Sequence, residues 1–127
     1  MPKYCITKYI YAKIRRKKIL SEELLNIEKI RNCVIDRNVV WTRHCLNRIN
    51  QRNILILDIK EAISNGKIIE YYYDDYPYPS CLITGKSKNN KIIHVVCGMN
   101  NNLVYMITAY YPDCEKWEED MKTRREG

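Results

Sequence analysis

Apolar residues recur at helical spacing in the first half of the chain and alternate as in strands in the second half. The change falls at Gly66, which stands where the end of a helix favours a left-handed residue. Ser, Thr and Asp residues precede the helical stretches and are predicted to cap their free backbone amides. The predicted helices extend from Ser21 to Asn38, from Thr42 to Arg52 with Thr42 as the cap, and from Ile59 to Asn65 with Asp58 as the cap.

Four segments after Gly66 have the composition of strands, and short connections rich in Asn, Asp and Pro separate them. Connections of this length form hairpins, so the strands are predicted to pair as an antiparallel meander. Pro112 then opens a last helical segment, Asp113 to Arg125, anchored by Trp117 and Met121. The predicted fold class is α+β, with N-terminal helices packed on a four-stranded antiparallel sheet and a short C-terminal helix. The predicted strands are Lys67–Tyr73, Cys81–Ser87, Lys91–Met99 and Leu103–Tyr110.

The composition is that of a globular protein. The chain has 127 residues, of which 46% are hydrophobic and 29% charged, which suits a single domain and argues against disorder. No apolar run approaches the roughly 18 residues that cross a bilayer, and lysines interrupt residues 1–20, so neither a transmembrane protein nor a secretory signal is expected. The six cysteines contain no C-x-x-C pair. We therefore expect buried free thiols in a cytoplasmic protein.

The net charge of +7 is unevenly distributed. Residues 1–60 contain 14 basic and 5 acidic residues, whereas residues 61–127 contain 8 and 10. A basic half indicates a surface that faces a polyanion, either nucleic acid or an acidic protein. A lean toward Lys, Ile, Asn and Tyr from an AT-rich genome explains the same excess without any function. The predicted organisation is a basic arm at 1–20, with a charged cluster at 15–18, followed by one domain at 21–127.

Three polar side chains share one stripe of the second predicted helix. His44, Arg48 and Arg52 are spaced four residues apart, so they lie along the border between buried and exposed surface. An imidazole exchanges protons near neutral pH, and a guanidinium binds phosphate with two donors. An exposed helix face with one incidental histidine explains the same pattern. The neighbouring stripe, predicted to face the core, consists of Trp41, Cys45 and Ile49.

The second histidine, His94, lies within an apolar strand segment. A histidine in such a place is either a packed core residue or a catalytic group. Thr108 and Tyr110 share one side of the last strand, where their hydroxyls either bind phosphate or line a solvent-exposed face. No metal-ligand spacing, glycine-rich phosphate loop or nucleophile motif is present, so neither a metal nor a cofactor is expected.

From Trp41 to Trp117 the chain resembles the family catalogued as domain of unknown function 4258, grouped with RelE- and BrnT-like toxins. The motifs that carry the resemblance are His44-x-x-x-Arg48-x-x-x-Arg52, Ile68-Ile69-Glu70-Tyr71 after Gly66, Gly85, His94-Val95-Val96 and Ile107-Thr108-Ala109-Tyr110-x-Pro112. The resemblance implies helices on a four-stranded antiparallel sheet. It also implies a relationship to small metal-independent ribonucleases that act as toxins beside an antitoxin protein. The first forty residues lie outside it.

These observations favour a metal-independent endoribonuclease that acts on RNA. His44 and His94 are predicted as the acid and base, in either order, with Arg48 stabilising the phosphorane. Arg52, Thr108 and Tyr110 are predicted to bind RNA or its phosphates. One alternative is a non-catalytic basic module that docks RNA or an acidic protein. A weaker one is a metal-dependent DNA nuclease, for which only Asp74-Asp75 offers adjacent carboxylates.

Overall fold

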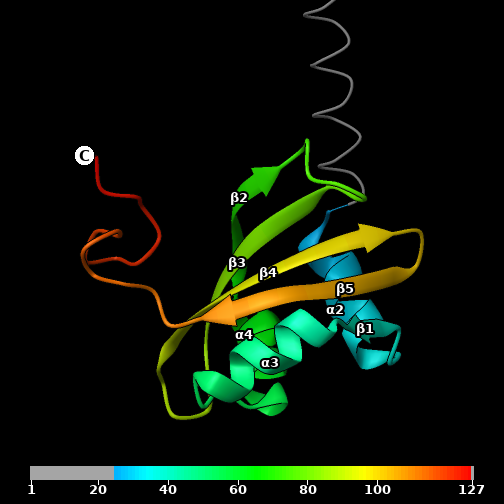
Figure 1. The fold of residues 1–127 in the computed structure, drawn as a ribbon, viewed down its shortest axis with the longest axis horizontal. Coiled ribbons are helices and arrows are strands. Elements are labelled where there is room, and N and C mark those ends of the chain that lie inside the picture. The colour runs from blue at the N-terminus through cyan, green and yellow to red at the C-terminus, as the bar shows by residue number, and fades with distance from the viewer. Residues whose placement is uncertain (1–24, 127) are drawn as a thin grey trace, which may run out of the picture.

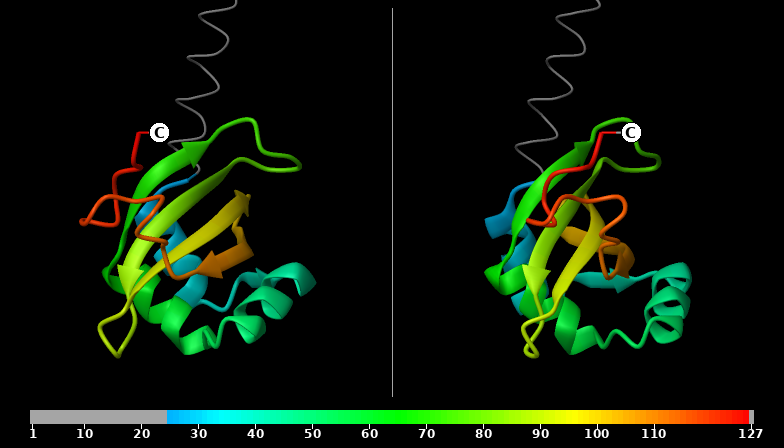
Figure 2. Two further views of the ribbon diagram at one scale, coloured as in Figure 1. Left: turned by 60° about the vertical axis from the view of Figure 1, so that its left-hand side comes forward. Right: turned by 90° about the vertical axis from the view of Figure 1, so that its left-hand side faces the viewer.

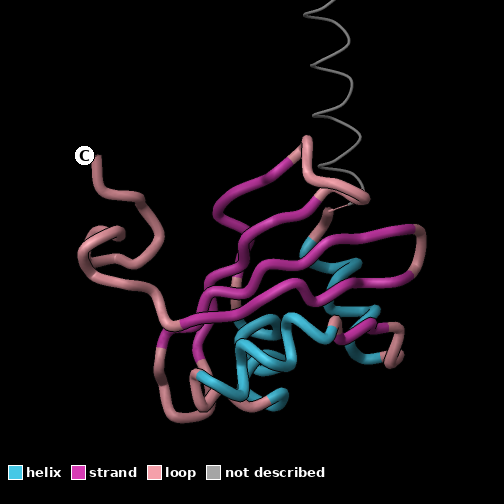
Figure 3. The backbone as a smooth tube through the Cα atoms, viewed as in Figure 1, coloured by secondary structure: helices cyan, strands magenta, loops and turns pink. Residues whose placement is uncertain are grey.

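The computed structural model of the chain describes residues 25–126, so the predicted basic arm and the predicted helix start at Ser21 lie outside the described part. Helices come first and the antiparallel strands follow, as Figures 1 and 3 show. Within residues 25–126, no helix is both long and apolar enough to cross a membrane. The elements are α2 (Ile27–Ile35), β1 (Val39–Trp41), α3 (Arg43–Gln51), α4 (Ile56–Asn65), β2 (Lys67–Tyr72), β3 (Ser80–Lys86), β4 (Ile92–Asn100) and β5 (Leu103–Tyr110).

The sheet has five strands in the order β1-β5-β4-β3-β2, so the predicted four-stranded antiparallel sheet is wrong. Strands β2 to β5 do pair antiparallel with their chain neighbours. The additional strand, β1, pairs parallel with β5, with Val39 opposite Val104 and Trp41 opposite Met106. Three residues are too few to display a two-residue hydrophobic period, and β1 gains its partner only through a contact distant in sequence.

The predicted C-terminal helix is also wrong, because residues 111–126 form an irregular segment of turns. The Asp120 carboxylate accepts hydrogen bonds from the backbone amides of Lys122 and Thr123, at 2.8 and 3.0 Å, and closes a tight turn. Met121 has a positive φ of 56°, which interrupts a right-handed helix. The segment folds back on itself through a bridge between Trp117 and Arg124.

Helices and C-terminal segment lie against opposite faces of the sheet (Figure 2). The hydrophobic core lies between the sheet and helices α2, α3 and α4. Its buried members include Ile30, Ile49, Ile63, Ile83, Val95 and Met106. Helix α4 approaches β3 so closely that a Cβ on Gly85 would lie 1.9 Å from the carbonyl oxygen of Ala62. Gly85 therefore sets the distance between helix and sheet.

The helix termini confirm one predicted cap and correct two other assignments. Thr42 caps α3, where its hydroxyl accepts the amide of Cys45 at 3.1 Å. Asp58 is not the cap of α4, because the helix begins one turn earlier, and its carboxylate instead accepts the amide of Leu55. Gly66 is extended, at φ −92°, rather than left-handed. Glycine is required there by space, since a Cβ would lie 2.4 Å from two carbonyl oxygens.

The cysteines of the described part are free thiols, as expected, and all but Cys114 are buried. Cys81 and Cys97 lie opposite each other on β3 and β4, with their sulfur atoms 3.9 Å apart. Burial raises the pKa of the Cys45 thiol to about 11, and Arg52 opposes this shift only partly. The Cys45 thiol is therefore protonated and packs as a small apolar group.

Candidate functional site

Strand alternation divides the sheet into a core face and a second face, which we call the outer face. On β4, Ile93 and Val95 belong to the core, so His94 between them points to the outer face. His94 lies opposite Thr84 on β3 and opposite Tyr110 on β5. Outer-face side chains include Glu70, Tyr72, Thr84, His94, Thr108 and Tyr110.

His94 is fully buried on this face, beneath the C-terminal segment. Its Nε2 atom lies 2.7 Å from the carbonyl oxygen of Met121. A carbonyl only accepts, so Nε2 carries the proton, and the unprotonated Nδ1 is a buried atom without a hydrogen-bond partner among the described residues. The ring contacts Trp117 and Tyr110 edge-on, with centroid distances of 4.6 and 5.4 Å. Burial lowers the pKa of His94, against opposing effects of the Met121 carbonyl and Glu70, and the imidazole is neutral.

The carboxylate of Glu70, on β2, lies within electrostatic reach of this histidine. Arg124 donates two hydrogen bonds to Glu70, at 2.7 and 3.1 Å, and the Tyr72 hydroxyl donates a third at 2.7 Å. Burial raises the pKa of Glu70, but these hydrogen bonds outweigh it, so its net pKa lies below the usual range. The Arg124 guanidinium also stacks over Trp117 at 4.5 Å from the ring centroid. Arg124 thus fastens the C-terminal segment to β2.

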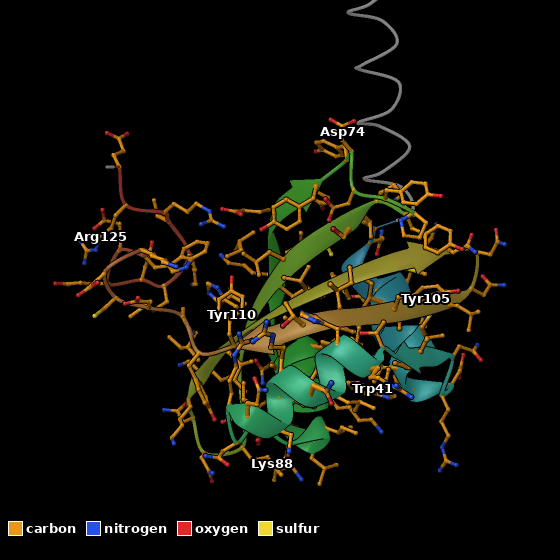
Figure 4. The ribbon with its side chains drawn as sticks, in the orientation of Figure 1. Trp41, Asp74, Lys88, Tyr105, Tyr110 and Arg125 are labelled. Carbon is orange, nitrogen blue, oxygen red and sulfur yellow. The ribbon has the colours of Figure 1, made fainter. Side chains whose placement is uncertain are left out.

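The end of helix α3 supplies a second arginine, which contacts β5, whereas Arg124 contacts β2. Arg52 donates to the carbonyl oxygen of Ala109 at 2.7 Å and to the hydroxyl of Thr108 at 3.2 Å. Burial raises the pKa of Tyr110, which also lies within electrostatic reach of Arg124, Glu70 and Arg52. Tyr110 lies at the end of β5, where the C-terminal segment departs (Figure 4). The structure therefore gathers four predicted site residues on one part of the outer face: Arg52, His94, Thr108 and Tyr110.

The other two predicted site residues, His44 and Arg48, do not join this group. Both are exposed on α3, and Cys45 and Ile49 of the same helix pack into the core as predicted. Arg52 is the residue that ends α3, and its side chain turns to β5. Because His94 is fully buried and His44 is exposed, the two imidazoles do not face one solvent-filled cleft.

Four residues around His94 had no predicted functional role: Glu70, Tyr72, Trp117 and Arg124. A lone acid within the apolar strand β2 is the one local signal that marks Glu70. Trp117 and Arg124 were assigned to a helix, which concealed their contact with the sheet. Among residues 25–126, no group of three or more His, Cys, Asp or Glu side chains is placed to hold a metal ion.

With this geometry established, comparison with known proteins defines the class to which the chain belongs. Residues 41–111 match the model of one protein family, so the protein is a member of that family. Its description is Domain of unknown function (DUF4258). Neither the curated proteins nor the solved structures contain a significant match to the chain. The matched range ends before Trp117 and Arg124, so the contacts that cover His94 come from outside it.

Proposed function

We propose that the protein is a metal-independent endoribonuclease, related to RelE- and BrnT-like toxins. Its reaction centre is the group of four predicted site residues that the outer face brings together. One observation carries the proposal. Arg52 from the end of α3, His94 from β4, and Thr108 and Tyr110 from β5 lie together on one part of the outer face, with the Glu70 carboxylate within electrostatic reach of His94. A guanidinium, a neutral imidazole and a phenol can supply charge stabilisation, a general base and a general acid for phosphodiester cleavage.

The side chains suggest a division of roles. The 2′-hydroxyl of RNA attacks the adjacent phosphorus and loses its proton to the unprotonated Nδ1 of His94. The bond to the 5′-oxygen breaks, and the leaving oxygen takes a proton from the phenol of Tyr110, which its raised pKa keeps protonated. Arg52 stabilises the additional negative charge of the phosphorane. The products are a 2′,3′-cyclic phosphate and a free 5′-hydroxyl. His44 and Arg48 have no part in this chemistry.

RNA reaches His94 only when the C-terminal segment moves aside. Trp117 is 2% exposed and covers the imidazole edge-on. The C-terminal segment contacts His94 through the Met121 carbonyl and the Trp117 ring, and it contacts Glu70 through the Arg124 ion pair. The conformation described here is thus the covered state of the enzyme, and an antitoxin protein or the RNA itself would control the segment. Such an enzyme acts in the cytoplasm, where its RNA substrate is.

The test is cleavage of end-labelled single-stranded RNA in EDTA by the full chain and by Trp117→Ala, which uncovers His94. We expect Trp117→Ala to cleave faster than the wild type and to leave 2′,3′-cyclic phosphate ends. The double variant Trp117→Ala/His94→Gln should then lose about 10²–10⁴-fold in rate, the usual contribution of a general acid or base. The matched control, Trp117→Ala/His44→Gln, should cleave like Trp117→Ala. Loss of cleavage in the control alone would contradict the site assignment.

The full burial of His94 favours a second candidate, a non-catalytic module that binds RNA or an acidic protein. In that case His94 serves only to seat the C-terminal segment. Its signature is salt-sensitive association without any product, even when Trp117→Ala uncovers the imidazole. The same assay therefore distinguishes the two functions.

A further inference from the structure

Four lysines from four parts of the fold converge on a hollow that the proposed reaction does not use. Lys67 comes from β2, Lys86 from β3, Lys88 from the β3–β4 turn and Lys122 from the C-terminal segment. The hollow has a volume of about 780 Å³, and we call it the lysine groove. Four lysines around one hollow create a local positive potential that favours an anionic occupant.

The lysine groove continues the row of outer-face residues that contains His94. Lys67 lies opposite Thr84, and Thr84 lies opposite His94. Neighbouring strands are about 4.8 Å apart, so the backbone of Lys67 lies about 10 Å from that of His94 across the sheet. A chain of phosphates that crossed His94 would run on into the groove.

Two acids line the groove, and neither removes its positive character. Asp120 has its carboxylate engaged by two backbone amides and the hydroxyl of Thr123. These hydrogen bonds, led by the one from Lys122, lower the pKa of Asp120, so its charge is retained and used within the turn. Glu61 is the second acid, on α4. Four cations against two anions leave the groove with a net charge of about +2.

The backbone under the lysines is rigidly placed. The side chain of Asn65, at the end of α4, donates to the carbonyl oxygen of Lys86 and accepts from its amide, both at 2.8 Å. The turn that carries Lys88 is closed by hydrogen bonds between Ser87 and Lys91. Lys67, Lys86 and Lys88 therefore stay in position when the C-terminal segment, with Lys122, moves.

We propose that the lysine groove binds the phosphate backbone of single-stranded RNA and leads it toward the row of His94. This inference rests on the proposed function and deepens it, because it names the surface that holds the substrate outside the reaction centre. The observations that carry it are the converging lysines, their register with His94 and the fixed backbone beneath them. None of these residues touches the reacting phosphate.

The test measures binding of a fluorescein-labelled single-stranded RNA by anisotropy over a range of salt concentrations. The variant is Lys86→Gln/Lys88→Gln, and the control is Lys29→Gln/Lys60→Gln, which removes the same charge from α2 and α4. Each lost phosphate contact reduces the slope of log Kobs against log salt by about 0.7 for a single strand, so the groove variant should lose about 1.4. When salt is lowered from about 1 M to about 0.1 M, the groove variant should therefore gain roughly 25-fold less affinity than the wild type. The control should keep the wild-type slope.

Each other outcome has a defined meaning. A groove variant that keeps the wild-type slope, while the wild type binds RNA, overturns the groove and leaves the proposed function intact. A wild type that binds no RNA overturns both. A polyglutamate peptide that binds more tightly than RNA, and depends on Lys86 and Lys88, overturns RNA as the occupant in favour of an acidic protein. Circular dichroism of both double variants verifies that each is folded.

Discussion

The two faces of one sheet are built in opposite ways. The core face is apolar and is covered by three helices, so that residues such as Ile83, Val95 and Met106 have no exposed surface. The outer face carries a carboxylate, an imidazole and phenols, and the covering described here is an irregular segment without helix or strand. Stability thus depends chiefly on the first face.

This difference between the two faces indicates which contacts can break without unfolding the whole protein. Burial of apolar area on the core face stabilises the fold as a whole. The outer face is covered through an ion pair, one carbonyl contact and one ring contact, which a local movement of residues 111–126 breaks without disturbing the core. The polar side chains of the outer face and the segment that covers them therefore lie together, apart from the residues that hold the sheet and helices in place.

The largest expected effect comes from Gly85→Ala on the core face. The new methyl group would lie 1.9 Å from the backbone oxygen of Ala62, so either α4 or β3 must shift. We expect the free energy of unfolding to fall by about 3 kcal/mol, as for a severe overpacking change. Urea denaturation followed by circular dichroism measures it.

Gly98→Ala is the matched control on the outer face. There the methyl group would lie 3.1 Å from the carbonyl oxygen of Pro79 and 3.8 Å from its next neighbours, a contact that a small movement relieves. The lower entropy of the unfolded alanine chain offsets part of the cost, so the change should stay within about 1 kcal/mol. Equal effects at the two glycines would show that the faces do not differ in this way.

The parts of the fold that rest on local signals were predictable from the sequence. The strand Leu103–Tyr110 has the predicted bounds, and Thr42 caps its helix as predicted. Strand β1 was not predictable, since its three residues carry no period of their own. The C-terminal helix was wrongly predicted, because helical composition was overruled by the turn at Asp120 and by the attraction of Trp117 to the sheet.

The candidate site was also predictable only where it leaves a local signal in the sequence. Strand alternation indicated that Thr108 and Tyr110 share a side, and only the register of β4 against β5 brings His94 to them. The pairing of Arg124 with Glu70 joins residues 54 positions apart and leaves no trace in the local pattern. Spacing along a helix suggested that Arg52 belongs with His44 and Arg48, but the helix ends at Gln51, and Arg52 turns away.

The next effect in size is a pH dependence of stability that belongs to the outer face. Burial lowers the pKa of His94 in the folded state, where Glu70, Arg124 and Tyr110 face it, so the unfolded chain binds the proton more readily. The stabilisation is complete above the unfolded pKa of about 6.5 and is lost as the pH falls through and below that value.

At pH 5.5 the loss of unfolding free energy from this group should amount to at most about 1.4 kcal/mol, the equivalent of one pKa unit. His94→Gln, which does not titrate, should remove this part of the pH dependence between about pH 7.5 and 5.5. His44→Gln, which replaces an exposed histidine, should leave it unchanged. Urea titrations at each pH measure the difference, and an equal slope in all three proteins would contradict the role of His94.

The smallest effect on stability, and the most specific, is expected for Arg124→Gln. Arg124 joins the C-terminal segment to Glu70 of β2, but its side chain is 53% exposed, so solvent screens the ion pair and its loss should cost only about 0.5 kcal/mol. That energy corresponds to a roughly twofold larger population of the uncovered state.

The measurement uses a His44→Gln background, in which His94 is the only histidine of the chain. The rate at which diethylpyrocarbonate modifies His94 then reports the uncovering directly. Arg125→Gln is the control, because Arg125 pairs with Glu118 and the carbonyl of Cys114 inside the segment and does not fasten it to the sheet. Faster modification in Arg124→Gln alone identifies the ion pair to β2 as the fastening, whereas equal rates in both variants would place the resistance to uncovering in Trp117.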